Sequence, residues 1–134
     1  YQDRKTSAAF GIYSSTVSDW ITPYVRPQEN ANRTELRWLR LEESNEESKG
    51  ESKNKGIRIV ADSSSTFSAS AWPYTRHTLE TTTHDYKLVN HTHTTLNIDC
   101  IQMGVGGDNS WGMPVHDQYM IYPGTYKFGF YIQK

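Results

Sequence analysis

Apolar and polar residues alternate in several short runs along this chain, and the alternation predicts β-strands. The clearest run is 124–133, in which aromatic or aliphatic side chains occupy every even position from Tyr126 to Ile132. Successive side chains of a strand point to opposite faces of the sheet, so a period of two is typical of a half-buried strand. Further runs lie at 10–13, 34–41, 57–61, 67–72, 86–88 and 96–100. Seven or so short strands with turn residues between them predict an all-β fold, an antiparallel β-sandwich.

The run at 34–41 changes face within its length. Its apolar residues are even-numbered up to Trp38 and odd-numbered from Leu39 onward, which predicts a β-bulge or burial on both faces. The segment 42–56 has no apolar side chain and carries charges of both signs. It has nothing to bury, so we expect a charged, flexible loop. Because the strand pattern resumes at 57–61, this loop is expected to close an antiparallel hairpin.

Proline and threonine positions predict two further local structures. Pro23 and Pro27 lack a backbone N–H, so 20–27 is expected to be a sheet edge or an extended connection. Thr75 is placed to cap a short helical turn that runs to Glu80. The three threonines that follow are poor helix formers, so the turn should end there.

The loop CIQMGVGGDNSWGMP, residues 100–114, interrupts the strand pattern and places a tryptophan among glycines. Its four glycines free the backbone, while Asp108, Asn109 and Ser110 can satisfy turn amides with their side chains. Little local bulk covers Trp111, which is therefore either packed beneath another part of the fold or presented as a flat apolar platform. Such a platform suits the C–H faces of a sugar, with the indole N–H as a polar handle. The residues alone leave both alternatives open.

Composition favours β-structure and narrows the possible partners. Aromatic residues make up 13% of the chain, and they favour strands. A length of 134 residues suits one domain, 1–134, with its own core. The net charge of -1 gives no attraction to nucleic acid or to an anionic membrane, and no stretch approaches the roughly 20 apolar residues that span a bilayer. We expect neither nucleic acid nor a membrane as a partner, and the single cysteine, Cys100, excludes an internal disulfide.

Few residues offer catalytic or metal-binding chemistry by themselves. His91 and His93 would share one face of a strand and, with His84, invite a metal site, but no carboxylate or thiol is spaced to complete one. We interpret them as surface or turn histidines and expect no metal.

Glycoside hydrolysis needs two carboxylates, about 5 Å apart in retaining enzymes. The candidate carboxylates are Glu29, Asp99, Asp108 and Asp117. Their spacing pairs none of them.

Five blocks of residues carry a resemblance that covers nearly the whole chain. They are YQDRKTSAAFGIY at 1–13, TPYVRPQENANR at 22–33, RWL at 37–39, LNID at 96–99 and QMGVGGDNSWG at 102–112. Together, and in this order, they resemble the region near the C-terminus of the large bacterial β-galactosidases of glycoside hydrolase family 2. The charged segment 42–56 is the exception. Several blocks in one order are more specific than any single motif.

The resemblance implies a fold and a parent activity. This chain looks like the C-terminal part of the last domain of a β-galactosidase, within a larger β-sandwich similar to galactose mutarotase. The parent would hydrolyse terminal β-D-galactosides with two glutamates in a central (β/α)-barrel that this chain does not contain, so the chain alone is expected to be noncatalytic. Its implied partners are a galactoside, in the full-length enzyme, and the catalytic barrel domain of the same parent. No cofactor is expected in this chain, because the Mg and Na ions often used by the family lie in other domains.

The same resemblance implies three substrate-binding residues. In the family a tryptophan at the position of Trp111 reaches across the domain boundary and lines the sugar site. The resemblance assigns substrate binding to Trp111 and to its neighbours Asp108 and Asn109. Many relatives carry a second aspartate where Asn109 stands, so this chain departs from them by the loss of one charge at that position. The block 22–33 would help to shape the surface turned toward the barrel, and its residues are equally typical of a hydrogen-bonded turn.

Two other functions remain open from the sequence. A free-standing carbohydrate-binding or mutarotase-like module would bind galactose by itself, whereas a purely structural domain would mediate homo-oligomer contacts through sheet edges that lack partners. The chain begins with Tyr1 rather than methionine, and we expect a piece of a longer protein. The sequence does not decide between the bacterial cytoplasm and the periplasm.

Overall fold

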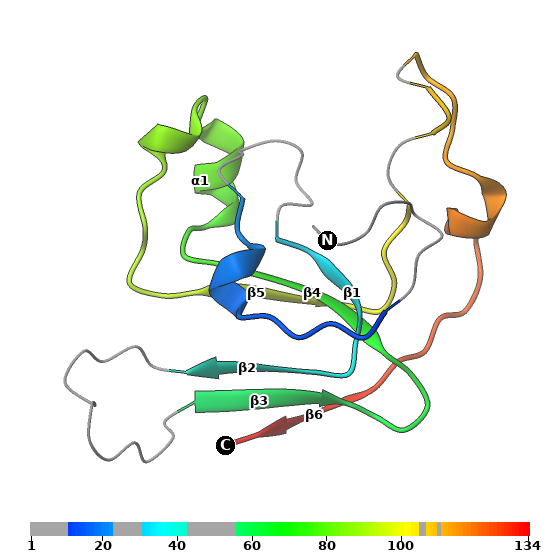
Figure 1. Ribbon diagram of the computed structural model, residues 1–134, viewed down its shortest axis with the longest axis horizontal. Coiled ribbons are helices and arrows are strands. Elements are labelled where there is room, and N and C mark those ends of the chain that lie inside the picture. Colours follow the sequence, from blue (N-terminus) through cyan, green and yellow to red (C-terminus); the bar gives the residue numbers. More distant parts are fainter. Residues whose placement is uncertain (1–10, 23–30, 43–55, 105–106, 110) are drawn as a thin grey trace.

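The computed structural model describes residues 11–22, 31–42, 56–104, 107–109 and 111–134. Within these ranges the backbone forms six strands and a few short helical segments (Figure 1). The strands are β1 (Arg33–Leu36), β2 (Trp38–Glu42), β3 (Gly56–Ala61), β4 (Phe67–Trp72), β5 (Thr95–Asp99) and β6 (Phe130–Gln133). The helical segments are α1 (Arg76–Thr81) and the 3-10 turns η1 (Val17–Trp20), η2 (Asp85–Lys87) and η3 (Asp117–Tyr119).

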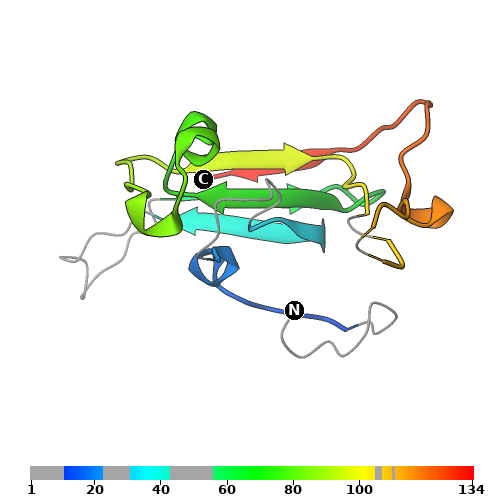
Figure 2. The same ribbon diagram turned by 90° about the horizontal axis from the view of Figure 1, so that it is seen from above.

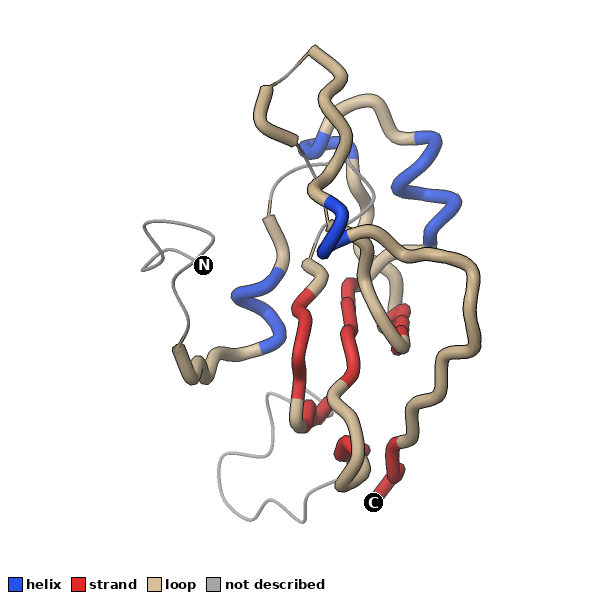
Figure 3. Tube along the Cα trace, turned by 90° about the vertical axis from the view of Figure 1, so that its right-hand side faces the viewer, coloured by secondary structure: helices blue, strands red, loops and turns tan. Residues whose placement is uncertain are grey.

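The strands form two three-stranded antiparallel sheets, in the orders β1-β4-β5 and β2-β3-β6. In the first sheet β4 is central, and its Ser70 lies opposite Asn97 of β5. In the second sheet β3 is central, and its Ile59 lies opposite both Leu39 and Ile132. Figure 2 shows the strands side by side, and Figure 3 shows the helical segments in blue around the red strands. The predicted all-β antiparallel sandwich is confirmed.

The core takes side chains from both sheets. Leu39 and Ile59 of the second sheet and Phe67 and Ala69 of the first are at most 2% exposed and belong to one cluster. The cluster also contains Trp20, Ala31, Trp72, Tyr74 and Leu79. Removal of this apolar surface from water is the main stabilising contribution to such a fold.

The predicted change of face at 34–41 has a structural cause, since the chain leaves one sheet there and enters the other. β1 ends at Leu36 and β2 begins at Trp38, with a bend at Arg37 between them. The pairing of β1 with β4 also shifts register between Arg33 and Leu36, where Glu35 has a φ of 57°. The predicted irregularity is confirmed, but the run forms two strands instead of one.

The predicted hairpin is also confirmed. β2 and β3 pair antiparallel from Trp38 opposite Val60 to Glu42 opposite Gly56. The charged segment between them, 43–55, lies outside the described residues, as do Pro23 and Pro27.

The strand and the capped helical turn predicted within 67–83 are confirmed, although the strand is fully buried and the helix runs one residue further than predicted. All six residues of β4, the central strand of its sheet, are buried. Its polar Ser70 is satisfied, since its Oγ accepts a hydrogen bond of 3.0 Å from Asn97 Nδ2. Thr75 caps α1: its Oγ1 accepts a hydrogen bond of 3.1 Å from the backbone N–H of Thr78. The helix ends at Thr81, at the start of the threonine run.

Three further sequence predictions are wrong wholly or in part. Residues 11–13 are not a strand, and 86–88 form most of η2 and its C-cap, with the Tyr86 side chain 77% exposed. Trp20 does not begin an extended connection but ends η1, where it is buried and its Nε1 donates a hydrogen bond of 2.8 Å to Ser15 Oγ. The runs at 11–13 and 86–88 have strand-like composition, yet no neighbouring strand in the described part of the chain pairs with them.

The C-terminal run is only partly a strand. The sequence predicts a strand over 124–133, whereas β6 covers Phe130–Gln133. β6 pairs with β3 from Arg58 to Ala61, and β3 ends there. Residues 124–129 therefore keep an alternating pattern but have no partner strand among the described residues, and a strand requires one.

Candidate functional site

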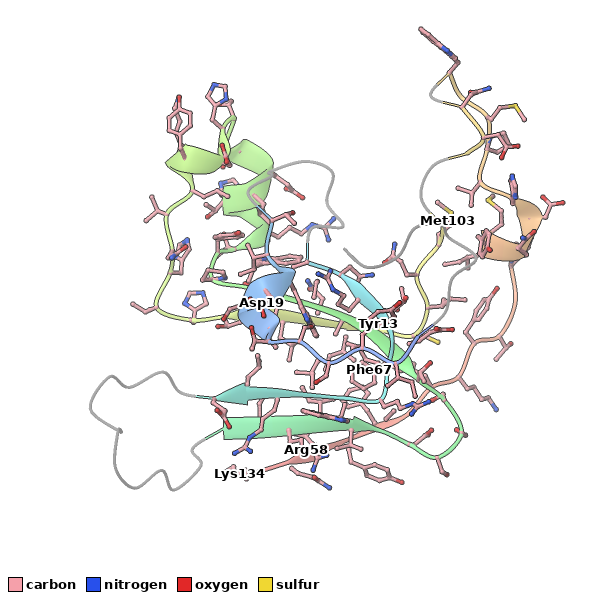
Figure 4. All side chains as sticks on the ribbon, in the orientation of Figure 1. Tyr13, Asp19, Arg58, Phe67, Met103 and Lys134 are labelled. Carbon is pink, nitrogen blue, oxygen red and sulfur yellow. The ribbon has the colours of Figure 1, made fainter. Side chains whose placement is uncertain are left out.

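The candidate site is an irregular two-limbed segment that we call the arm, residues 100–122. It follows β5 and contains η3, and 105, 106 and 110 lie outside its described residues. In Figure 1 the arm, yellow to orange, rises away from the sheets, and Figure 2 places it at the opposite end of the strands from α1. Figure 4 labels Met103 near the base of the outgoing limb. The predicted end of strand structure after β5 is confirmed.

At its base the arm is closed by a backbone contact. The N–H of Gly104 donates a hydrogen bond of 2.8 Å to the carbonyl oxygen of Tyr119. A Cβ on Gly104 would lie 2.6 Å from both Tyr119 Cβ and Val115 Cγ1. The outgoing and returning limbs therefore touch here so closely that only a glycine fits.

Halfway along the arm the limbs meet again, through backbone and side chain. A Cβ on Gly107 would overlap the carbonyl oxygen of Met113 and lie 2.8 Å from that of Pro114. The next residue, Asp108, contacts the returning limb through its carboxylate, whose Oδ1 lies 2.6 Å from His116 Nε2. Both of these side chains are largely exposed.

At the tip, the side chain of Asn109 organises the backbone around the tryptophan. Its Oδ1 accepts a hydrogen bond of 2.9 Å from the backbone N–H of Trp111 and a longer one, 3.4 Å, from that of Met113. Gly112 follows with a φ of 109°, a conformation that favours glycine. The predicted use of Asn109 as a turn acceptor is confirmed.

The Trp111 side chain is 92% exposed. No hydrogen bond or ring contact to its indole occurs in the described part of the chain. Of the two alternatives that the sequence left open, this exposure contradicts packing of Trp111 beneath the described part of the chain. Sugar binding by the exposed indole stays a prediction.

The three predicted substrate-binding residues thus lie together at the tip of the arm, but with different surroundings. Trp111 presents an open aromatic face, Asn109 is engaged by the backbone, and Asp108 is engaged through one oxygen by His116. Sequence reasoning missed His116. The available signal was a histidine eight residues after an aspartate, across a glycine-rich turn.

The other carboxylates considered in the sequence have separate surroundings. Asp117, in η3, accepts a hydrogen bond of 3.2 Å from the hydroxyl of Tyr122. Asp99 is exposed at the end of β5, and Glu29 lies outside the described residues.

The histidines interpreted in the sequence as surface or turn residues lie outside the strands and helices and are exposed. His84 stacks on Tyr86 with 5.4 Å between ring centroids, and His91 Nε2 lies 3.2 Å from Thr78 Oγ1. His91 and His93 are not in a strand. Within the described ranges no group of three or more histidine, cysteine or acidic side chains is close enough to hold a metal ion. The expectation that this chain holds no ion stays a prediction.

A membrane span was also sought among the described residues, and no helix there has the length and apolar character to cross a bilayer.

Comparison with known proteins gives a family match over nearly the whole chain. The family model described as "Beta galactosidase small chain" matches residues 1–132. A β-galactosidase from Halalkalibacterium halodurans is 38% identical over 121 residues, which are 90% of this chain. β-Galactosidases from Priestia megaterium and Bifidobacterium adolescentis are 37% and 34% identical over 122 residues each, 91% and 90% of this chain. In each case the match spans 11% of the length of the relative.

Proposed function

The chain belongs to the β-galactosidase small-chain family, and from this premise we propose that it is a noncatalytic domain of a longer enzyme that hydrolyses terminal β-D-galactosides. We place it at the C-terminal end of a family 2 glycoside hydrolase, in a supersandwich similar to that of galactose mutarotase. Its match to only 11% of each relative supports a parent of much greater length. The catalytic glutamates are assigned to the barrel domain of that parent.

The exposure of Trp111 is the observation that carries a role in the sugar site. A large apolar ring in water has no stabilising effect on this chain, whereas it can pack against the C–H faces of a sugar. The indole is 92% exposed, and the arm that carries it is tied together at its base, middle and tip. We therefore assign the indole as an aromatic wall that this chain supplies to a pocket completed by the barrel domain.

The acidic residues of the arm support a noncatalytic role. A retaining glycosidase needs two carboxylates about 5 Å apart that flank the same bond. Asp108 is hydrogen-bonded to His116, and Asp117 accepts a hydrogen bond from Tyr122. These contacts suit carboxylates that shape the arm.

The edge of the second sheet supports contact with the rest of a larger sandwich. β6 pairs with β3 on one side, and in the described structure no strand pairs with its other side. Ile132 of β6 is 64% exposed, and in the segment that leads into β6 Tyr126 and Phe128 are 48% and 37% exposed. We assign other strands of the same parent polypeptide as the cover of this edge, since open apolar edges otherwise promote association.

Turnover of a nitrophenyl β-D-galactoside tests the proposal in the full polypeptide that carries this chain. We expect that polypeptide to hydrolyse the substrate and the 134-residue chain alone to be inactive. Trp111→Ala in the full polypeptide should lower kcat/KM about 5-fold or more, because loss of one aromatic contact is worth about 1 kcal/mol or more. Trp38→Ala, which removes another exposed indole far along the chain from the arm, is the matched control and should leave kcat/KM unchanged.

Two results would contradict the proposal: hydrolysis by the 134-residue chain alone, or full activity of the Trp111→Ala enzyme. A galactose titration of the chain alone distinguishes a free-standing binding module. We expect no binding, because one aromatic face without converging polar groups gives little affinity. Millimolar or tighter binding that Trp111→Ala abolishes would replace our proposal with that alternative.

A further inference from the structure

The position of the Trp111 indole depends on the backbone of the arm alone. In the described part of the chain its ring makes no hydrogen bond and no ring contact, and its side chain is 92% exposed. Because the side chain has no packing contacts among the described residues, its position is set by the position of its own backbone. Whatever fixes the tip of the arm therefore fixes where the indole lies.

Two neighbouring residues, Asp108 and Asn109, accept the hydrogen bonds that hold the tip of the arm. Asp108 is held by His116, at 2.6 Å from Oδ1 to Nε2, and Asn109 accepts a hydrogen bond from the Trp111 N–H. Among the described residues of the arm, the Asp108–His116 contact is the one side-chain to side-chain hydrogen bond that joins the outgoing limb to the returning limb. It acts at the residue next to the Asn109 turn.

We propose that His116 is a positioning residue for Trp111, acting through Asp108. The histidine side chain donates to the carboxylate and holds the outgoing limb, the Asn109 turn then holds the Trp111 amide, and the indole projects from a fixed point. The effect on the tip stands on the contacts described here. The effect on catalysis rests on the proposed function of Trp111.

Because Asp108 and His116 are exposed, a role in positioning Trp111 can be distinguished from a role in global stability. The two side chains are 53% and 66% exposed, and such an exposed side-chain contact contributes little to global stability. Loss of the pair should leave the unfolding midpoint of the chain unchanged. It should release the tip, because among the described residues the other side-chain contact between the limbs at this level is the long bond of 3.4 Å from the Met113 N–H to Asn109 Oδ1.

Nitrogen-15 relaxation of the tryptophan amides in the 134-residue chain measures this directly. Labelling tryptophan gives one backbone amide signal for each of the four tryptophans, so Trp20, Trp38 and Trp72 are internal references. In the unchanged chain we expect an order parameter near that of rigid backbone, about 0.85, at Trp111. In His116→Ala and in Asp108→Ala it should fall below about 0.6, the range of flexible backbone, while the three reference amides stay unchanged.

Two further variants show whether the hydrogen bond itself is responsible. Asp108→Asn keeps an acceptor oxygen for His116 and should retain most of the order at Trp111. The double variant Asp108→Ala with His116→Ala should be no more mobile than either single variant, because both remove the same contact. His77→Ala, on the exposed surface of α1, is the matched histidine control and should leave the Trp111 amide unchanged.

The inference is overturned if the Trp111 amide is as ordered in His116→Ala as in the unchanged chain. It is equally overturned if Asp108→Asn is as mobile as Asp108→Ala. A fall in order at the reference amides as well would show a general loss of structure, and this too counts against positioning.

Kinetics of the full polypeptide then test the catalytic consequence. His116→Ala should raise KM about 3- to 10-fold with a smaller change in kcat, and Asp108→Asn should restore most of the loss. Failure of Trp111→Ala to change galactoside turnover would remove the proposed function, while the relaxation result at Trp111 would still decide the positioning role of His116.

Discussion

The central strand β4 and the arm show two different ways of fixing a segment of chain. All six residues of β4 are buried, and Phe67, Ala69 and Ala71 are at most 1% exposed. The arm has no comparable burial, and its described contacts are single hydrogen bonds and close approaches of the returning limb to two glycines, Gly104 and Gly107. Burial is non-directional and additive with area, whereas each contact of the arm is directional and local. Global stability therefore resides in the strands, and the placement of the exposed indole resides in the arm.

The largest effect is expected in the core. Phe67→Ala should lower the free energy of unfolding by about 3–5 kcal/mol, because it removes a buried ring and leaves a cavity. The centroid of this ring lies 6.4 Å from the ring centroid of Phe130. Urea denaturation followed by far-UV circular dichroism measures this. Trp111→Ala is the matched aromatic control and should change the same free energy by about 0.5 kcal/mol or less. Similar losses for the two variants would remove the distinction between core and arm.

A glycine in the arm should give the next largest effect, and a local one. A Cβ at Gly107 would overlap the carbonyl oxygen of Met113, so Gly107→Ala has to push the two limbs apart at a cost of about 1–3 kcal/mol. Hydrogen exchange of the Gly104 amide, which donates to Tyr119, should become about 10- to 100-fold faster. The amide of Ala61, which donates to Arg37 in the sheet region, should be unchanged.

Gly124→Ala is the control for the Gly107 variant. The nearest atom to a Cβ at Gly124 is 3.8 Å away, an ordinary contact. Unchanged Gly104 exchange in Gly107→Ala, or equal acceleration in Gly124→Ala, would show that close packing of the limbs does not hold the arm.

Strand predictions succeed where the alternating run has a partner strand and fail where it has none. The runs that became β3, β4 and β5 were predicted with nearly their observed bounds, and each pairs with a neighbour. The run at 124–129 alternates as clearly, but β3 ends at Ala61 and gives it no partner. Alternation is a property of the segment, whereas strand formation also needs the neighbouring segment, which a single sequence does not specify.

In the arm, local chemistry was predictable and the contact between limbs was not. The Asp-Asn-Ser sequence among glycines predicts a turn with side-chain acceptors, and Asn109 forms one. The Asp108–His116 contact depends on the path that the chain takes around the tip. The close approach of Gly107 to Met113 depends on the same path. Neither contact has a local sequence pattern.

Loss of the hydrogen bond that caps α1 should have an intermediate effect on the free energy of unfolding. Thr75→Ala removes the oxygen that accepts the hydrogen bond from the Thr78 N–H and caps α1, which should cost about 1 kcal/mol in the free energy of unfolding. The loss should reach the global transition because α1 places Leu79 in the core. Thr75→Ser keeps the hydroxyl and should retain most of the stability. An equal loss in both variants would mean that the methyl group, and not the cap, is responsible.

The smallest expected effect is on the pH dependence of stability, and it involves Tyr74, a buried residue of the core. Burial raises the pKa of the Tyr74 phenol above its usual value of 10.0, because the phenolate loses its hydration in the core. The unfolded chain therefore releases this proton at a lower pH than the folded chain does. The contribution of Tyr74 to stability is complete below about pH 10 and is lost as the pH rises through the higher pKa of the folded state. Tyr74→Phe has no proton to lose, so its free energy of unfolding should fall less between pH 9 and pH 11 than that of the unchanged chain, as urea denaturation at each pH will show. An equal fall in both chains would indicate that Tyr74 ionises in the folded protein as easily as in water, and that its part of the core is open to solvent.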